Sequence, residues 1–144
     1  MKTTAKLILL ALTISLFSCS KSNDNNVTPS STNKTEQVTG NWNVTYYLDS
    51  GKDETSDFSG YNFAFNSGDV LLAVNGSTTY TGSWRIGDSS SRDDSSSNRL
   101  VITISGSKAI DNLQHNWLIV KITDKEIWLK DDNISSNEEI HFGR

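Results

Sequence analysis

Short runs in which apolar and polar residues alternate are the feature of this chain that most restricts its fold. Such runs recur between residues 42 and 142 and are separated by Gly, Asn, Asp and Ser. A period of two places successive side chains on opposite faces of a β-strand, whereas a helix buries residues at intervals of three and four. Because no long segment shows the helical interval, the pattern predicts an all-β domain.

The first half of the domain contains two aromatic strands and a hairpin. The aromatic runs give each strand one face to bury, which holds Trp42, Val44, Tyr46 and Leu48 in the first strand and Tyr61, Phe63 and Phe65 in the second. Asn75-Gly76 predicts a two-residue type I′ turn, which pairs Val74 with Ser77. This register gives the hairpin a core face made of Leu71, Ala73, Tyr80, Trp84 and Ile86.

Four more strands are expected in the second half, at residues 100–105, 117–122, 127–130 and 139–142, with a helical turn at 107–113. A hairpin around Asp124-Lys125 places Trp117 and Trp128 on one face, with Ile119 beside them. The opposite, wholly apolar face would hold Leu118, Val120, Ile122, Ile127 and Leu129. Seven or eight antiparallel strands in chain order favour a small up-and-down β-barrel, which leaves no exposed edge. A two-sheet β-sandwich is the alternative.

The N-terminus reads as an export signal. Lys2 and Lys6 precede an apolar segment at residues 7–17, which is too short to span a bilayer. The run Leu16-Phe17-Ser18-Cys19 that ends it resembles the lipobox of bacterial lipoproteins. This resemblance implies cleavage after residue 18 and acylation of Cys19, which would anchor the protein to a membrane through its acyl chains. An ordinary signal peptidase site with an incidental Cys is the alternative.

The residue after the cysteine indicates which membrane the lipoprotein would be sorted to. An Asp at this position would suggest retention in the inner membrane, but the residue here is Ser20. The outer membrane is therefore the expected location, in either its inner or its outer leaflet. Cys19 is also the only cysteine, so the exported domain forms no internal disulfide and depends on its own core.

The mature chain divides into a tether and one domain. Residues 20–37 are mostly Ser, Asn, Thr and Asp, a composition that does not build a core, so residues 19–37 are expected to form a flexible tether and residues 38–144 the folded domain. Without Lys2 and Lys6 the chain keeps 11 of its 13 basic residues against 17 acidic ones. This acidic balance argues against nucleic acid as a partner.

Gly40-Asn41-Trp42 resembles the Gly-x-Trp signature at the entry to the first strand of lipocalins. With the polar run at residues 52–61 it looks like the lipocalin-like lipoprotein domains of Bacteroidetes, a group without an assigned role. The resemblance implies a barrel whose closed end is crossed by Trp42 and covered by a basic residue, for which Arg144 is the candidate.

No catalytic or metal-binding pattern is evident in the sequence. His115 and His141 are far from metal-ligand spacing, and no nucleophile motif accompanies them. The acidic pairs at 131–132 and 138–139 read as solvated loop charges, and a calcium loop at residues 88–94 is a minor alternative that lacks the EF-hand spacing. We therefore expect a non-enzymatic protein without cofactor or metal.

The leading functional hypothesis is binding of a small apolar molecule or a glycan in the lumen or at the mouth of the barrel. The alternative is an interaction module or accessory subunit of an envelope complex, with a filled barrel and a partner protein bound on its outer face. The candidate ligand-binding residues are Tyr80, Trp84, Trp117 and Trp128.

Overall fold

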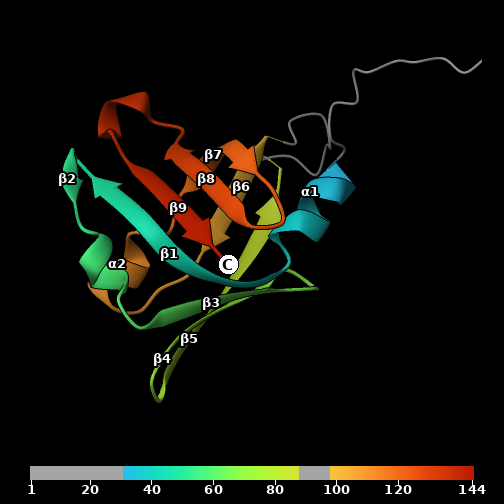
Figure 1. Ribbon diagram of the computed structural model, residues 1–144, viewed down its shortest axis with the longest axis horizontal. Coiled ribbons are helices and arrows are strands. Elements are labelled where there is room, and N and C mark those ends of the chain that lie inside the picture. Colours follow the sequence, from blue (N-terminus) through green and yellow to red (C-terminus); the bar gives the residue numbers. More distant parts are fainter. Residues whose placement is uncertain (1–30, 88–97) are drawn as a thin grey trace, which may run out of the picture.

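The computed structural model describes residues 31–87 and 98–144 (Figure 1). The export signal, Cys19, most of the expected tether and the acidic loop at 88–94 lie outside these residues. In chain order the elements are α1 (Ser31–Val38), β1 (Gly40–Asp49), β2 (Lys52–Asp53), the 3-10 helix η1 (Thr55–Phe58), β3 (Tyr61–Asn66), β4 (Val70–Asn75), β5 (Thr78–Ile86), β6 (Arg99–Thr103), α2 (Lys108–Asp111), β7 (Asn116–Ile122), β8 (Glu126–Asp131), the 3-10 helix η3 (Ile134–Ser136) and β9 (Glu139–Gly143).

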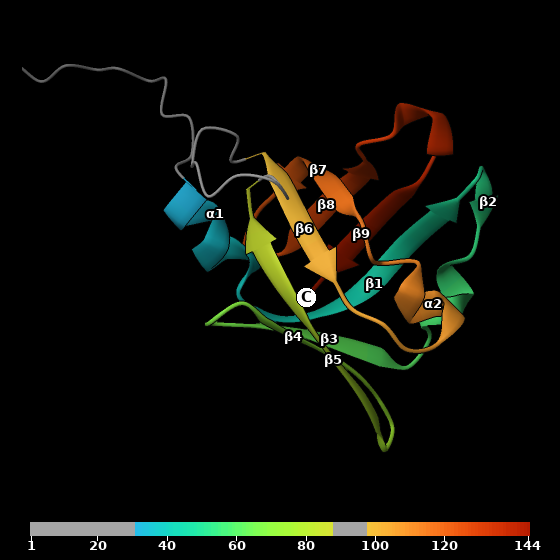
Figure 2. The same cartoon turned by 180° about the vertical axis from the view of Figure 1, so that it is seen from behind.

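The strands close into a barrel. From β3 to β9 each strand pairs antiparallel with the next one in the chain, and β9 returns to pair with β1. Eight strands therefore form the ring, and the short β2 extends one end of β1 beyond it (Figures 1 and 2). The predicted up-and-down barrel is confirmed, and its closure excludes the sandwich.

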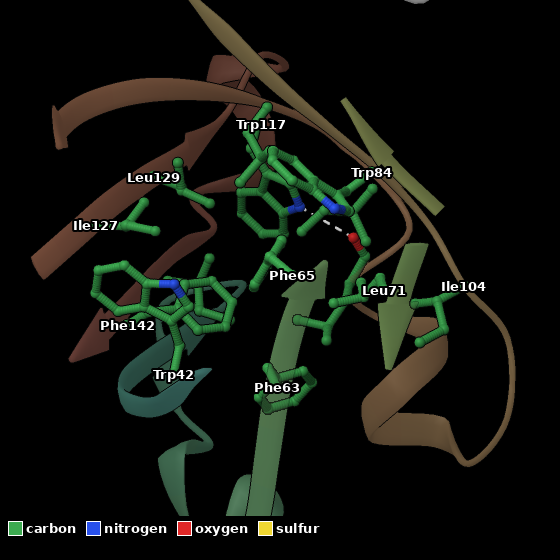
Figure 3. Close-up of a cluster of buried hydrophobic side chains, with 14 of the residues drawn as sticks. Trp42, Phe63, Phe65, Leu71, Trp84, Ile104, Trp117, Ile127, Leu129 and Phe142 are labelled. Carbon is green, nitrogen blue, oxygen red and sulfur yellow. Dashed lines mark hydrogen bonds between the residues drawn. The ribbon is translucent and has the colours of Figure 1, made fainter. Parts of the chain in front are cut away.

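The interior is packed with aromatic and aliphatic side chains (Figure 3). The largest fully buried ones include Trp42, Trp117, Tyr47, Phe63, Phe65 and Phe142. Burying one large apolar side chain contributes about 1.5–3 kcal/mol, so this interior is the main source of stability in a domain without disulfides. The wall of an eight-stranded barrel leaves just enough room for side chains to fill it.

The first departure from strict alternation lies in β1. The register of β1 against β9 shifts between Val44 and Tyr46, as a β-bulge produces. Past this point Tyr47 is 1% exposed and faces the core, while Tyr46 lies on the outside with His141. The prediction that Tyr46 is buried and Tyr47 exposed is wrong because one extra residue exchanges the two faces of the strand.

A second register shift, between β7 and β8, shows that the predicted face shared by Trp117 and Trp128 is wrong. Ile119 pairs with Leu129, but the next pair joins Lys121 to Trp128, which leaves Val120 as the extra residue. Trp117 is fully buried and Val120 is 55% exposed, so Trp117, Ile119, Leu118 and Val120 occupy the faces opposite to those predicted. Ile122, Ile127 and Leu129, on the other side of the bulge, point inward as predicted.

The hairpin between β4 and β5 turns one residue later than predicted. Asn75 pairs with Thr78 and Val74 with Thr79, so Gly76 and Ser77 form the turn. Of these two only Gly76 has positive φ (+57°), as in a type II′ turn with glycine first. Each residue of β4 therefore pairs with a β5 residue two positions further along the chain than predicted. Because this shift is an even number of residues, every side chain keeps its predicted face. Leu71, Ala73 and Trp84 are buried, and Tyr80 packs partly buried against the core.

Helix α1 covers one end of the barrel and packs against β5 and β7. It occupies the last residues of the segment whose composition predicts a tether. Val38 is fully buried and Lys34 is 7% exposed, so both side chains pack against the barrel. Val38 supplies the apolar contact of this otherwise polar helix, and Lys34 donates a hydrogen bond to Asn98. Composition averaged over the segment does not reveal this docking.

Candidate functional site

The interior of the barrel is occupied by its own side chains. Phe142 lies between Phe63 and Phe65, with ring centroids 5.6 and 5.7 Å apart, and Phe65 packs edge-on against Trp84 at 5.5 Å. This contact chain runs through the region where a ligand-carrying barrel holds its cargo (Figure 3). The packing argues against a lumenal ligand site.

The buried tryptophans are satisfied within the protein. The indole N–H groups of Trp42, Trp84 and Trp117 donate to the backbone carbonyls of Val38, Asn66 and Leu113, at 2.7, 2.9 and 3.0 Å. Buried indole groups need such partners, and these three have no donor left for a ligand. Of the four predicted ligand-binding residues, Trp84 and Trp117 therefore belong to the core.

Tyr80 is also committed to packing. Its ring stacks on Tyr61 with centroids 6.5 Å apart and lies directly against Gly106, where an added Cβ would fall 2.3 Å from the ring. The Tyr61 hydroxyl in turn bonds to the Ser107 hydroxyl at 3.1 Å. These contacts fix the segment before α2 to the barrel.

Trp128 is the one predicted ligand-binding residue on the outer wall, and it lies in a row of side chains that crosses four strands. The cross-strand pairs join Lys121 to Trp128, Trp128 to His141 and His141 to Tyr46. The His141 ring stacks on the indole at 4.6 Å, and the Lys121 ammonium lies 4.4 Å from the indole centroid. Since β7 and β9 flank β8 on opposite sides, both faces of the indole are covered, and the predicted platform shared with Trp117 is not formed.

A groove opens on the barrel wall where β1 parts from β3. These strands pair only over the first three residues of β1, and β1 then pairs with β9 on its other side. η1 packs into the resulting gap, held by a hydrogen bond from the Tyr47 N–H to Thr55 Oγ1 at 2.9 Å. The groove measures about 430 Å³ and is lined by Asn43, Val44, Thr55, Ser56, Phe58, Ser59, Gly60, Tyr61 and Asn62.

The groove is polar without being charged, since none of its lining residues is acidic or basic. Phe58, 3% exposed, closes its floor against Tyr47, and Tyr61 adds an aromatic wall. In residues 31–87 and 98–144 the amides of Asn43 and Asn62 have no hydrogen-bonding partner, which leaves their donors and acceptors available. The sequence shows these two only as outward positions of alternating strands, so periodicity alone does not single them out.

A separate cluster brings together one histidine and two acids. His115 precedes β7, Asp131 ends β8 and Glu138 precedes β9, and one ligand atom from each lies within 4.8 Å of the others. Asp131 is 7% exposed, so its interpretation as a solvated loop charge is wrong: the β8 to β9 connection covers it. His115 is a partly exposed loop residue and His141 a partly exposed strand residue, as expected.

The two acids of the cluster have opposite pKa shifts. Burial raises the pKa of Glu138, although the nearby His115 opposes the shift. Burial also works against ionisation of Asp131, but hydrogen bonds from the Ser136 side chain and the Asn133 N–H hold the pKa of Asp131 below its usual value. Asp131 is thus stabilised as a carboxylate, whereas Glu138 has fewer partners for its charge.

Comparison with known proteins finds one solved structure with a similar fold and assigns no role to the groove or the cluster. The chain is similar to the crystal structure of a DUF4847 family protein from Bacteroides vulgatus, with a TM-score of 0.50 and 12% sequence identity. The likeness covers 73% of this chain and 92% of that protein, and at this identity it concerns the fold alone. No protein-family model and no curated protein matches the sequence.

None of the helices within residues 31–87 and 98–144 combines the length and the apolar character that crossing a bilayer requires.

Proposed function

We propose that this protein is a lipid-anchored, non-enzymatic glycan-binding protein of the bacterial cell envelope, built on a lipocalin-like barrel whose lumen is filled. The observation that carries the proposal is the neutral groove between β1, η1 and β3, which presents amide and hydroxyl groups beside an aromatic ring. Sugars are uncharged and rich in hydroxyl groups, so they hydrogen-bond to such amides and place their apolar faces against aromatic rings.

The size of the groove suits one or two sugar residues. Ligand sites for small molecules typically span about 300–1,000 Å³, and the groove, at about 430 Å³, lies toward the small end of that range. The expected ligand is therefore a neutral oligosaccharide rather than a fatty acid or another wholly apolar molecule.

Binding is tested by calorimetric titration of neutral oligosaccharides into mature protein purified from membranes in detergent. Asn43→Ala and Asn62→Ala should each weaken binding by about tenfold, since each removes one hydrogen-bonding amide. Asn41→Ala is the matched control because Asn41 lies two residues away on the same strand, exposed and outside the groove. Equal affinity in all three variants, or no binding to any neutral sugar tried, would refute the proposal.

The anchor is tested separately. In cells that express the full chain, Cys19→Ala should move the protein from the membrane fraction to the soluble fraction, since acyl chains are the proposed attachment. Mass spectrometry of the wild-type protein should find the N-terminal cysteine acylated. A Cys19→Ala protein that still sediments with membranes would argue against lipid anchoring and would leave the groove proposal intact.

An interaction module is the second candidate, and the filled lumen favours it because such a barrel offers only its outer surface. Within residues 31–87 and 98–144 the exposed large apolar side chains are Val70 and Val120, which lie on β4 and β7 with two strands between them, so they do not form one patch. A photo-crosslinking residue at position 120 that captures one envelope protein, while one at position 70 captures none, would support this candidate.

A further inference from the structure

The cluster of His115, Asp131 and Glu138 lies outside the proposed glycan groove and shares no residue with it. Three separate parts of the chain contribute one side chain each: the link from α2 to β7, the end of β8 and the link into β9. Lone acidic pairs on one loop are common at protein surfaces. Here a histidine from a distant part of the chain lies between two acids, which is a different arrangement.

The distances place the imidazole between the carboxylates. His115 Nε2 lies 3.4 Å from Glu138 Oε2, and His115 Nδ1 lies 3.9 Å from Asp131 Oδ1. The side chains of Asp131 and Glu138 are 6% and 15% exposed, while that of His115 is 34% exposed. The acids therefore form the inner wall of the cluster, and the histidine closes it toward solvent.

One oxygen in the cluster has no hydrogen-bonding partner. Glu138 Oε2 is shielded from solvent and accepts no hydrogen bond from the described part of the chain. A buried acceptor without a partner costs about 1–3 kcal/mol, and more when it carries charge. The His115 Nε2 atom, 3.4 Å away, forms an ion pair with this oxygen when the ring is protonated but makes no hydrogen bond to it, so the oxygen is available as a ligand to a metal ion.

We propose that His115, Asp131 and Glu138 bind a divalent first-row transition metal ion, with Zn²⁺ as the reference ion. One imidazole nitrogen with two carboxylate oxygens is a ligand set that Zn²⁺ accepts, at about 2.0–2.2 Å from each atom. Tetrahedral ligands at that radius lie about 3.3–3.6 Å apart, which the distance of 3.4 Å between His115 Nε2 and Glu138 Oε2 matches. Asp131 lies nearest to the other ring nitrogen, at 3.9 Å, so binding of the metal through Nε2 requires the Asp131 carboxylate to approach, from a cluster whose ligand atoms already lie within 4.8 Å of one another.

The surroundings allow an ion to enter. Cavities lie on both sides of Asp131, one of about 180 Å³ that also borders Glu138 and one of about 420 Å³ that also borders His115. Both leave room for water in the open coordination positions of the metal. The bound ion would join the segment before β7, the end of β8 and the segment before β9, so it would hold this end of the barrel together.

The test is titration of Zn²⁺ into metal-stripped mature protein without an affinity tag, at pH 7.5, against a colorimetric chelator. One equivalent should bind, and His115→Ala should weaken binding by at least about tenfold. His141→Ala is the matched control because His141 pairs with Glu139 at 2.7 Å on the outer wall and lies outside the cluster. Glu138→Gln keeps the shape of the side chain and should also weaken binding, which covers the case in which His115→Ala fails to fold.

Two further readings make the result decisive. Co²⁺ in place of Zn²⁺ should give visible absorption bands that disappear in His115→Ala and persist in His141→Ala. Zn²⁺ should raise the melting temperature of the wild type and of His141→Ala, but not that of His115→Ala. Absence of Zn²⁺ and Co²⁺ binding at 100-fold excess would overturn the proposal. Binding that survives in His115→Ala but is lost in His141→Ala would overturn it too, because the metal would then lie at Glu139 and His141.

Discussion

The Arg144 guanidinium lies over the Trp42 indole, with its central carbon 4.0 Å from the ring centroid. This is the arrangement that the Gly-x-Trp resemblance implies, and it joins the first strand of the barrel to the last residue of the chain. Arg144 also donates hydrogen bonds to the carbonyls of Asp124, Thr39 and Gln37. One side chain thus ties the β7 to β8 turn, the end of α1 and the core tryptophan together.

Removing Arg144 should therefore destabilise the whole domain. We expect Arg144→Ala to lower the free energy of unfolding by about 1–2 kcal/mol, because a cation–π contact and several hydrogen bonds from a charged donor are lost together. Urea unfolding followed by tryptophan fluorescence measures this. Lys130→Ala, which breaks a surface ion pair with Glu139, should change stability by less than about 0.5 kcal/mol. Equal effects of the two variants would show that the Arg144 contacts contribute little.

Because of the bulge in β7, a charged substitution should have very different effects on stability at the neighbouring positions 119 and 120. Val120→Asp should cost less than about 1 kcal/mol, because Val120 is 55% exposed. Ile119→Asp should cost more than about 3 kcal/mol or prevent folding, because it places a charge in the core beside Leu129. Chemical denaturation and yield of soluble protein distinguish the two. The reverse order would mean that β7 continues without a bulge.

The raised pKa of the buried Tyr47 phenol predicts that the fold loses stability at alkaline pH. Burial raises the pKa of its phenol, and the carboxylates of Asp49, Glu138 and Glu54 add to the shift. A group whose pKa is higher in the folded state stabilises the fold fully below its unfolded pKa, near 10, and that contribution falls as the pH rises further. The free energy of unfolding should therefore decline between about pH 9.5 and 11.

The matched pair for this test is Tyr47→Phe and Tyr46→Phe. Tyr47→Phe should flatten the alkaline decline, since its side chain cannot ionise in either state. Tyr46→Phe is the control, because it makes the same change on the outer wall and leaves the buried phenol of Tyr47 in place. Stability measured by urea unfolding at several pH values gives both slopes, and identical slopes for the two variants would contradict the assigned faces of β1.

Gly82 should tolerate no side chain. An added Cβ would lie 2.3 Å from the Thr103 carbonyl oxygen and 2.6 Å from the Ile104 Cβ, so β5 and β6 would have to separate. We expect Gly82→Ala to cost about 2 kcal/mol or more, as overpacking against backbone does. Ser83→Ala, at the next and exposed position, should change stability by less than about 0.5 kcal/mol. Thermal melting checks both, and a melting temperature for Gly82→Ala within a degree of wild type would contradict the close strand approach.

The order of the strands and most of the core were predictable from the sequence, because short connections make each strand pair with the next. The two bulges were not predictable from alternation alone. At each of them neighbouring residues are of one class, Tyr46 and Tyr47 in β1 and residues 118–120 in β7, so the apolar pattern fits either phase. Pairing with the adjacent strand decides between the phases, and that information is not local.

The candidate sites were harder to predict than the fold. The groove depends on where β1 stops pairing with β3, and the acidic cluster depends on three segments that meet only after the barrel closes. His115 is 16 residues from Asp131 and 23 from Glu138 along the chain, so no local spacing marks them as neighbours.

Helix α1 also determines how the domain faces the bilayer once Cys19 carries acyl chains. Eleven residues lie between that cysteine and Ser31, so the start of the helix is at most about 40 Å from the acylated residue. Under the proposed acylation, the end of the barrel with α1 and Arg144 is the end from which the chain leads to the anchor, while α2 and η1 lie at the opposite end (Figures 1 and 2). The groove lined by η1 would then open at the part of the barrel remote from the proposed anchor.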